Sequence, residues 1–342
     1  MSKRHGNQTV ILTNPVGIIA GASVVGPKEG EGPLGEFFDQ IVQDPLFGAD
    51  SWEKAESKFV KAAAELAVQK ADAAFCDFDY VIAGDLLNQS VGSIFGLRET
   101  DVPYLGIFGA CSAMGEGLGL GAMLIDGGFA RNILCMASSH FCSAEKQFRF
   151  PLEFGTQRAP TAGWTVTGAA AIALSSRLTG VCVTAATTGK MVDMGVTDAN
   201  NLGAAMAGAA AETIAAHLAD TGRRADYYDL ILTGDLGHVG SELLLALTSK
   251  QGLDIAAVHA DCGMKIFNQI TQDTHAGGSG CACSGVTFAG YYLEQMKRGE
   301  LNKLLFVPTG ALMSQTTVQQ GESIPGIAHA VAVETTQGYA GV

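Results

Sequence analysis

The stretch Phe108-Gly-Ala-Cys-Ser-Ala-Met-Gly115 combines the end of an apolar run, a cysteine and a series of small residues. The apolar run is typical of a buried strand, and the small residues predict a helix that begins directly after the cysteine. Cys111 would then lie at a helix N-terminus, where free N–H groups and the positive end of the helix dipole stabilise a thiolate. The stretch therefore predicts an activated cysteine, and the question is which residues serve it.

Composition favours a tightly packed α/β protein. Of the 342 residues, 47% are hydrophobic, 16% are charged and 44 are glycine, which suits closely packed helices and argues against disorder. The net charge is −13, from 21 basic and 34 acidic residues. Because no basic stripe offsets this charge, we expect no nucleic acid as a partner.

The eight cysteines are scattered and lie mostly inside apolar runs. We therefore expect reduced thiols and a cytosolic compartment, and no metal site, because Cys281-Ala-Cys283 has no second ligand pair at a suitable spacing. We expect no signal peptide, because the polar N-terminus leads only to the short apolar run Val10–Leu12. We expect no transmembrane segment either, because the longest apolar run, Leu105–Ile125, contains Glu116 and several glycines.

The chain contains an internal repeat. Ala62-Ala-Ala-Glu65 and Asp79–Asp85 resemble Ala209-Ala-Ala-Glu212 and Asp229–Asp235, and the cysteine stretch with its helix resembles the segment from Cys281 onward. The same order in both copies predicts a duplicated α/β core, with an N-terminal half over 1–178 and a C-terminal half over 179–342. We expect an irregular lead over 1–14, an ordered insertion over 139–165, strands over 17–26, 78–84, 102–110, 131–138 and 167–175, and helices over 57–74 and 112–126.

This arrangement resembles the thiolase-like fold, a duplicated five-layer α-β-α-β-α core with mostly parallel sheets. The local motifs resemble the stage V sporulation protein AD family within that superfamily, over nearly the whole chain. The motifs are Asp79-Tyr-Val-Ile-Ala-Gly-Asp-Leu-Leu-Asn-Gln89, Gly109-Ala-Cys-Ser112, Ser138-Ser-His140, Gln147-Phe-Arg-Phe-Pro151, Gln157-Arg-Ala-Pro-Thr161 and Trp164-Thr-Val-Thr-Gly168.

Thiolase-like enzymes pair the cysteine with a histidine and with a second histidine or an asparagine, both from the second half. In the register that the repeat suggests, those positions read Gly234 and Gly278, while His238 and His275 lie nearby. A cysteine without a base and oxyanion donors loses orders of magnitude in rate. We therefore expect a binding pocket with Cys111 at its floor and no catalytic residues.

The resemblance implies dipicolinic acid (pyridine-2,6-dicarboxylate) as the ligand, free or as its calcium chelate, taken up into the developing spore. Its two carboxylates need cations or N–H donors, and its ring needs an apolar slot. The insertion offers donors, and the carboxyl ends of the strands offer further polar groups. We predict six ligand-binding residues: Asp85, Cys111, Ser139, His140, Arg149 and Arg158. Each of the last three also has a structural interpretation, as an ion-paired arginine or a hydrogen-bonded core histidine, and Asp85 has one as a helix cap.

Two alternatives stay open. One is an acyl-CoA-dependent condensing or thiolytic enzyme with Cys111 as nucleophile and His238 or His275 as base. The other is an assembly factor for a membrane transport complex, with a vestigial pocket. The resemblance further implies a homodimer, other stage V A-group sporulation proteins as partners, some of them membrane-embedded, and a cytoplasmic or peripheral location at the spore inner membrane. We expect no cofactor other than calcium carried by the ligand.

Overall fold

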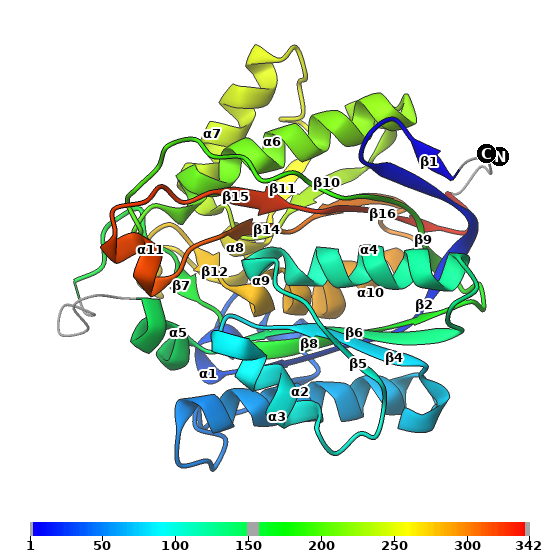
Figure 1. Cartoon of the computed structure of the whole chain (residues 1–342), viewed down its shortest axis with the longest axis horizontal. Helices are drawn as coiled ribbons and strands as arrows, with labels where there is room; N and C mark the ends of the chain where they lie inside the picture. The colour runs from blue at the N-terminus through cyan, green and yellow to red at the C-terminus, as the bar shows by residue number, and fades with distance from the viewer. Residues whose placement is uncertain (1–2, 149–156, 339–342) are drawn as a thin grey trace.

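A computed structural model describes residues 3–148 and 157–338, and Figure 1 shows them in five layers. Helices α2 (Trp52–Lys70) and α3 (Val91–Leu97) cover one outer face, and α6 (Leu202–Thr221) and α7 (Gly237–Lys250) cover the other. Helices α4 (Ala113–Asp126), α9 (Cys281–Thr287) and α10 (Leu293–Lys297) lie between the two layers of strands. The order of layers is thus α-β-α-β-α.

The strands of the two layers follow one connectivity twice. The first layer contains β2 (Thr9–Val25), β4 (Tyr80–Gly84), β5 (Tyr104–Gly106), β6 (Asn132–Ser139) and β8 (Gly168–Ser175), in the order β5-β4-β6-β8-β2. The second contains β9 (Val181–Thr187), β10 (Leu230–Thr233), β11 (His259–Asp261), β13 (Lys303–Val307) and β16 (Ala330–Thr335), in the order β11-β10-β13-β16-β9. In chain order both read third, second, fourth, fifth, first. The predicted boundary at 178/179 falls between β8 and β9 and stays a prediction.

The direction of the strand pairs also repeats. β4 is parallel to β5 and β6, and β10 is parallel to β11 and β13. The pairs β6–β8, β8–β2, β13–β16 and β16–β9 are antiparallel. Strand β2 pairs with β8 along Gly17–Val25 and with β9 along Thr9–Ile11, so it joins both layers into one continuous sheet.

The smaller elements complete the chain. They are β1 (Arg4–His5), α1 (Pro27–Gly30), β3 (Gln40–Ile41), α5 (Phe141–Phe148), β7 (Trp164–Thr165), α8 (Cys262–Ile266), β12 (Gly278–Ser279), β14 (Thr309–Ala311), α11 (Gln315–Gln319) and β15 (Gly326–Ala328). The expected irregular lead over 1–14 is wrong, because Arg4–His5 and Thr9 onward form β1 and the start of β2. The expected strand over 102–110 shortens to β5, and the helix expected from residue 57 begins at Trp52, where the Ser51 side chain caps it.

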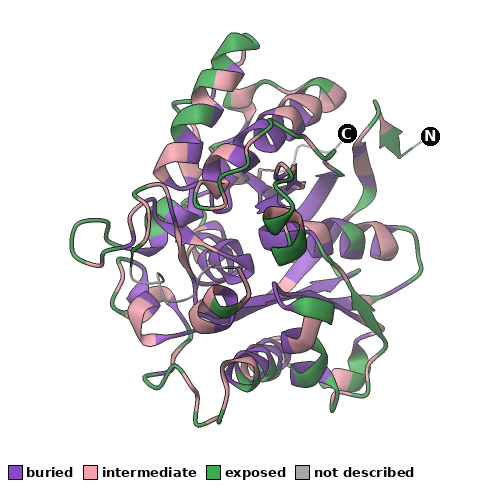
Figure 2. Ribbon diagram, turned by 60° about the vertical axis from the view of Figure 1, so that its left-hand side comes forward, coloured by how far each residue is buried: buried purple, intermediate pink, exposed green. Residues whose placement is uncertain are grey.

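Small residues let the central helices fit between the strands. Helix α4 carries Gly117, Gly119 and Gly121 on buried surface, and a Cβ at Gly121 would come within 3.0 Å of the Cys135 sulfur and of a Leu174 methyl. Helix α9 is buried throughout, whereas α4 and the outer helices also carry intermediate and exposed residues (Figure 2). The many glycines and alanines of the sequence therefore follow from helices that are enclosed by strands on two sides.

Helix α6 is the one described helix that is long and apolar enough to cross a bilayer by length and composition. Within the fold, 67% of its apolar window is buried. It therefore has the burial of a core helix, and its apolar face packs against β15, β14 and α7.

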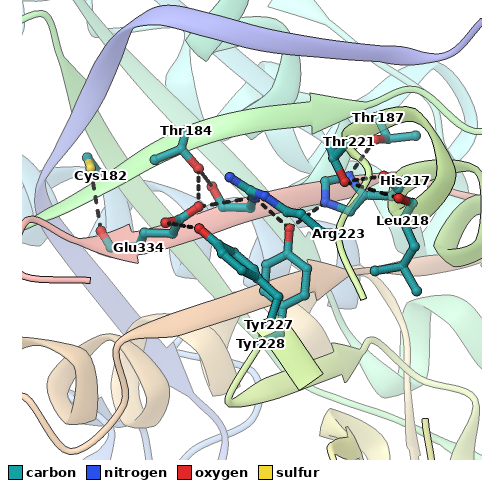
Figure 3. A network of polar contacts seen from close by, with 11 residues as sticks. Cys182, Thr184, Thr187, His217, Leu218, Thr221, Arg223, Tyr227, Tyr228 and Glu334 are labelled. Atoms are coloured by element: carbon teal, nitrogen blue, oxygen red, sulfur yellow. Dashed lines mark hydrogen bonds and ion pairs between the residues drawn. The ribbon is translucent and has the colours of Figure 1, made fainter. Parts of the chain in front are cut away.

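A buried polar network ties the end of α6 to β16 (Figure 3). Arg223 lies 3.1 Å from the Glu334 carboxylate and donates a 2.8 Å hydrogen bond to the Tyr228 hydroxyl. The same hydroxyl lies 2.5 Å from Nε2 of His217, and Thr184 of β9 donates to Glu334 over 2.7 Å. Since Glu334 is fully buried, this cation is what compensates its charge.

Candidate functional site

The predicted cysteine turn is present. Cys111 lies in a single 3-10 turn, Ala110–Ser112, that leads directly into α4. Ala110 has φ +46°, a left-handed conformation that is unusual for alanine, and the Ser112 hydroxyl donates a 2.6 Å hydrogen bond to Gly109. The backbone of β14 packs on this turn so closely that a Cβ at Gly310 would lie 2.3 Å from the Gly109 carbonyl oxygen. The turn is therefore fixed from both sides.

A cavity of about 170 Å³ opens beside the cysteine, and both halves of the chain line it. Most of its wall is apolar, and the polar side chains on it are those of Cys111, Glu145, Thr161, Thr165, Asn200, Asp235 and Ser279. The apolar part includes Leu86, Phe108, Phe148, Leu202, Met313 and Val318. Among the lining residues that the structure describes there is no lysine, arginine or histidine.

Asp235 lines this cavity together with Cys111. It follows β10 and is 4% exposed. Its Oδ2 accepts hydrogen bonds of 3.0 Å from the Ser279 hydroxyl and from the Gly280 amide, and its Oδ1 accepts one of 2.9 Å from Thr309. One carboxyl thus connects β12, the start of α9 and β14 beside the cysteine.

This environment keeps the thiol protonated. Burial and the neighbouring Asp235 carboxyl hold the pKa of the Cys111 thiol well above its usual range, although the Gly280 amide acts in the opposite direction. Burial also raises the pKa of Asp235 to about 6, and its hydrogen bonds limit that rise. The start of α4 alone would favour a thiolate, but burial and the carboxyl outweigh it.

The positions expected to hold the catalytic partners have no room for them. A Cβ at Gly234 would come within 2.9 Å of the Thr309 amide nitrogen and 3.0 Å of Pro308 Cα, and one at Gly278 within 2.5 Å of an Ile266 methyl. The side chain that enters the cavity after β10 is that of the next residue, Asp235. A histidine or asparagine at either position would require its neighbours to shift.

The two nearby histidines lie away from the cavity lining. Nδ1 of His275 is 2.8 Å from the Ala159 carbonyl oxygen, and its Nε2 is 3.1 Å from the Asp273 carboxylate. His238 lies in the first turn of α7, and its amide donates to the Ala276 carbonyl. Neither lines the cavity that contains Cys111.

Of the six predicted ligand residues, Cys111 lines the cavity, whereas Asp85 and Ser139 hold the protein around it together. Asp85 accepts hydrogen bonds from the Leu87 amide and from the amide and hydroxyl of Ser93, so it organises the turn after β4. The Ser139 hydroxyl donates a 2.7 Å hydrogen bond to the Val166 carbonyl oxygen and accepts one from the Ala282 amide. The second bond anchors the start of α9.

The basic candidates have structural partners where the structure describes them. Nε2 of His140 is 2.8 Å from the Pro45 carbonyl oxygen, and burial lowers the pKa of this histidine. The guanidinium of Arg158 donates a 2.6 Å hydrogen bond to the Asp273 carbonyl oxygen. Its Cζ lies 4.6 Å from the centroid of the Trp164 ring. Arg149 lies outside the described residues. His140 and Arg158 therefore do not line the cavity, and their ligand role stays a prediction.

Sequence reasoning missed Asp235, Ser279 and Glu145 as lining residues. The internal repeat already aligned Asp235 with Asp85, so that a buried carboxyl at the end of β10 was open to inference. Glu145 lies on α5, inside the segment that we expected to be an insertion. No group of three or more histidine, cysteine, aspartate or glutamate side chains suited to a metal ion occurs in residues 3–148 and 157–338.

Comparison with known proteins identifies the family. The family model for stage V sporulation protein AD matches residues 6–334. The protein belongs to the stage V sporulation protein AD family. Stage V sporulation protein AD of Bacillus subtilis (strain 168) is 43% identical over 336 residues, which cover 98% of this chain and 99% of that protein. Family membership supports a role in sporulation, as the sequence predicted.

Solved structures confirm the predicted thiolase-like fold class of this family member. Crystal structures of Xanthomonas campestris OleA, one of them with bound cerulenin, match with a TM-score of 0.60 at 15% identity and cover 95% of this chain. They match over 99% and 100% of their own length. 3-Oxoacyl-[acyl-carrier-protein] synthase III from Aquifex aeolicus matches with a TM-score of 0.56 at 14% identity, over 93% of this chain and 99% of its own. At these identities the likeness concerns the fold alone.

Proposed function

We propose that this protein binds dipicolinic acid in the cavity beside Cys111 and supports its uptake into the developing spore without a catalytic step. The observation that carries the proposal is that Cys111 shares its cavity with the buried Asp235 carboxyl and with no described histidine. A thiol that stays protonated, in a cavity without a histidine among its described lining residues, suits a binding site better than acyl transfer.

The size of the cavity supports a small ligand. Drug-sized molecules occupy pockets of about 300–1,000 Å³, whereas this cavity measures about 170 Å³. A single aromatic ring with two carboxylates fits such a volume, and Phe108, Leu86 and Phe148 offer apolar surface for the ring. A long acyl chain would need additional room.

The charges at the site favour a ligand that is neutralised. Asp235 and Glu145 both line the cavity, and no lysine or arginine does among the residues described there. Two carboxyls repel a bare dianion, but they offer oxygen atoms to the calcium of a neutral 1:1 chelate. The Thr165 hydroxyl is then a donor for a carboxylate of the ligand, whereas the Thr161 hydroxyl already donates to the Asn200 carbonyl.

Isothermal titration calorimetry with purified protein tests the proposal, with dipicolinate titrated in the presence and absence of calcium. Ala144 lines the cavity from α5 and is 4% exposed, so Ala144→Leu adds three carbons to the cavity wall. We expect this variant to bind roughly five- to 150-fold more weakly, since overpacking costs about 1–3 kcal/mol. Ala219→Leu, on an exposed position of α6, is the matched control and should bind as the parent does.

Absence of heat, and of any shift in melting temperature, with saturating dipicolinate in both conditions would contradict the proposal. Equal affinity of Ala144→Leu and the parent for dipicolinate would mean that the ligand binds outside this cavity. A stable acyl adduct on Cys111 after incubation with an acyl-CoA, lost in Cys111→Ala, would instead support the condensing enzyme. Normal dipicolinate accumulation in spores that carry Ala144→Leu at normal protein level would favour the assembly role.

We further propose that two copies pair through β5 and act with membrane-embedded stage V A-group proteins at the spore inner membrane. Strand β5 ends the sheet, and Tyr104 and Leu105 on it and Phe95 on the neighbouring helix α3 are exposed. An exposed apolar edge strand is suited to pairing with another strand. Leu105→Glu would bring two like charges together across such an interface. We expect light scattering to report a dimer for the parent and a monomer for this variant; a monomeric parent would contradict the pairing.

A further inference from the structure

Hydrogen-bond donors from three separate elements converge on the carboxyl of Asp235. They are the Ser279 hydroxyl on β12, the Gly280 amide at the start of α9 and the Thr309 hydroxyl on β14, at 3.0, 3.0 and 2.9 Å. The Cys111 thiol lines the same cavity as this carboxyl. A carboxyl that is 4% exposed thus has donors on both of its oxygens.

Donors that converge beside a cysteine form the kind of arrangement that stabilises an oxyanion. In this protein a side-chain carboxylate, that of Asp235, already occupies the place of such an oxyanion. We infer that the Asp235 carboxylate is a built-in anion that fills the donor cluster of Ser279, Gly280 and Thr309 and thereby keeps Cys111 as an unreactive thiol. The cluster is then not free for an oxyanion of a reacting substrate, and the cysteine is blocked by a single side chain.

Electrostatics explains the effect on the thiol. A carboxylate close to a thiol opposes the loss of the thiol proton, because two negative charges would then lie near each other in a buried place. The other titratable groups close to the pair are Asp261, Cys262, Cys281 and Cys283, with Glu145 across the cavity. None of these groups supplies a positive charge, so nothing among them offsets Asp235.

Alkylation of Cys111 by iodoacetamide measures the reactivity directly. In this reaction the sulfur bonds to the methylene carbon of the reagent, iodide leaves and the thiol proton passes to solvent. Peptide mass spectrometry separates Cys111 from the exposed Cys76, which serves as internal reference. We expect Asp235→Asn, which removes the charge and keeps the shape, to alkylate Cys111 roughly tenfold faster or more at neutral pH, because each unit of lowered pKa gives ten times more thiolate.

Asp254→Asn is the control, because Asp254 is an exposed aspartate that is not among the residues lining the cavity. It should leave the rate at Cys111 unchanged. Asp235→Ala offers a second test, since it leaves the donors of Ser279, Gly280 and Thr309 open. Added sodium formate should occupy them and slow alkylation in this variant, whereas sodium chloride at equal ionic strength should do so less.

Equal alkylation rates in Asp235→Asn and the parent, with melting temperatures showing that both are folded, would overturn the inference. So would an Asp235→Ala variant that does not respond to formate. If neither variant folds, the pH dependence of the Cys111 alkylation rate in the parent decides. An inflection at or below about 8.5, the ordinary pKa of cysteine, contradicts the inference. An inflection well above that value supports it. Dipicolinate takes no part in these measurements, so their outcome is independent of the proposed ligand.

Discussion

The substitution Asp235→Asn should change how the stability of this protein depends on pH. Burial raises the pKa of Asp235 to about 6 from an ordinary 3.8. A carboxyl with a raised pKa binds its proton more tightly in the folded than in the unfolded state. Its favourable contribution is therefore fully present below pH 3.8 and is lost as the pH rises through 6. The difference of about two pH units corresponds to roughly 3 kcal/mol at 1.36 kcal/mol per unit.

Asparagine keeps the shape of the side chain and part of its hydrogen bonding. Its oxygen can accept from Ser279 and Gly280 in the place of Oδ2, and its amino group can donate to the Thr309 hydroxyl in the place of Oδ1. Any cost of the altered hydrogen bonds is the same at every pH, so it does not affect the slope. For 342 residues the entropy of unfolding is about 0.7 kcal/mol/K, and 3 kcal/mol then corresponds to about 4 °C.

Differential scanning calorimetry at constant ionic strength from pH 4 to pH 8 checks this value. The melting temperature of Asp235→Asn, relative to that of the parent, should rise by about 4 °C from the acid to the alkaline end. Asp254→Asn, at an exposed aspartate, should show a constant difference. A constant difference for Asp235→Asn as well would refute the reasoning, since it would mean that Asp235 ionises in the folded protein as readily as in the unfolded chain.

Two further substitutions test the packing of the second half and of the cysteine turn. Arg223→Met leaves the fully buried Glu334 with only the hydroxyls of Thr184 and Tyr227 as partners. Calorimetry should show that the free energy of unfolding falls by about 3–5 kcal/mol, and that the double variant Arg223→Met/Glu334→Leu largely regains it. A double variant as unstable as the single one would contradict a buried unpaired charge. Gly310→Ala forces a Cβ to within 2.3 Å of Gly109, so it should lower both the melting temperature and the affinity for dipicolinate, whereas Gly180→Ala, with open space around it, should change neither.

The sequence predicted the cysteine turn because its signal is local. Small residues after Cys111, with an apolar run before it, suffice to predict a strand, a turn and a buried helix, and α4 begins at Ala113 as a result. The order of elements was predictable for the same reason. The beginning of β2 was not, because Thr9, Thr13 and Asn14 are polar and are held there by pairing with β9 and by Asp126, which are distant in the chain.

Side-chain roles depended on contacts that the sequence does not reveal. The partner of His140 is the carbonyl of Pro45, and that of Arg158 is Asp273, more than a hundred residues away. Asp235 was visible in the repeat, but whether it or Gly234 enters the cavity depends on the backbone of Pro308 and Thr309 beside it. One residue of register at the end of β10 thus separates a position without space from a residue that lines the cavity beside the cysteine.

Strand β2 imposes an order on the folding of the chain. Its outer part, Thr9–Ile11, pairs with Ala185–Thr187, so this contact forms only after more than half of the chain has been synthesised. The pairs from Gly17 to Val25 need only the residues up to Ser175. The first layer can thus form during synthesis while Thr9–Ile11 still lack their partner strand β9. Pairing between segments so distant in the chain slows folding. A chain stalled between the two stages would expose a strand edge, and we expect that intermediate to aggregate first.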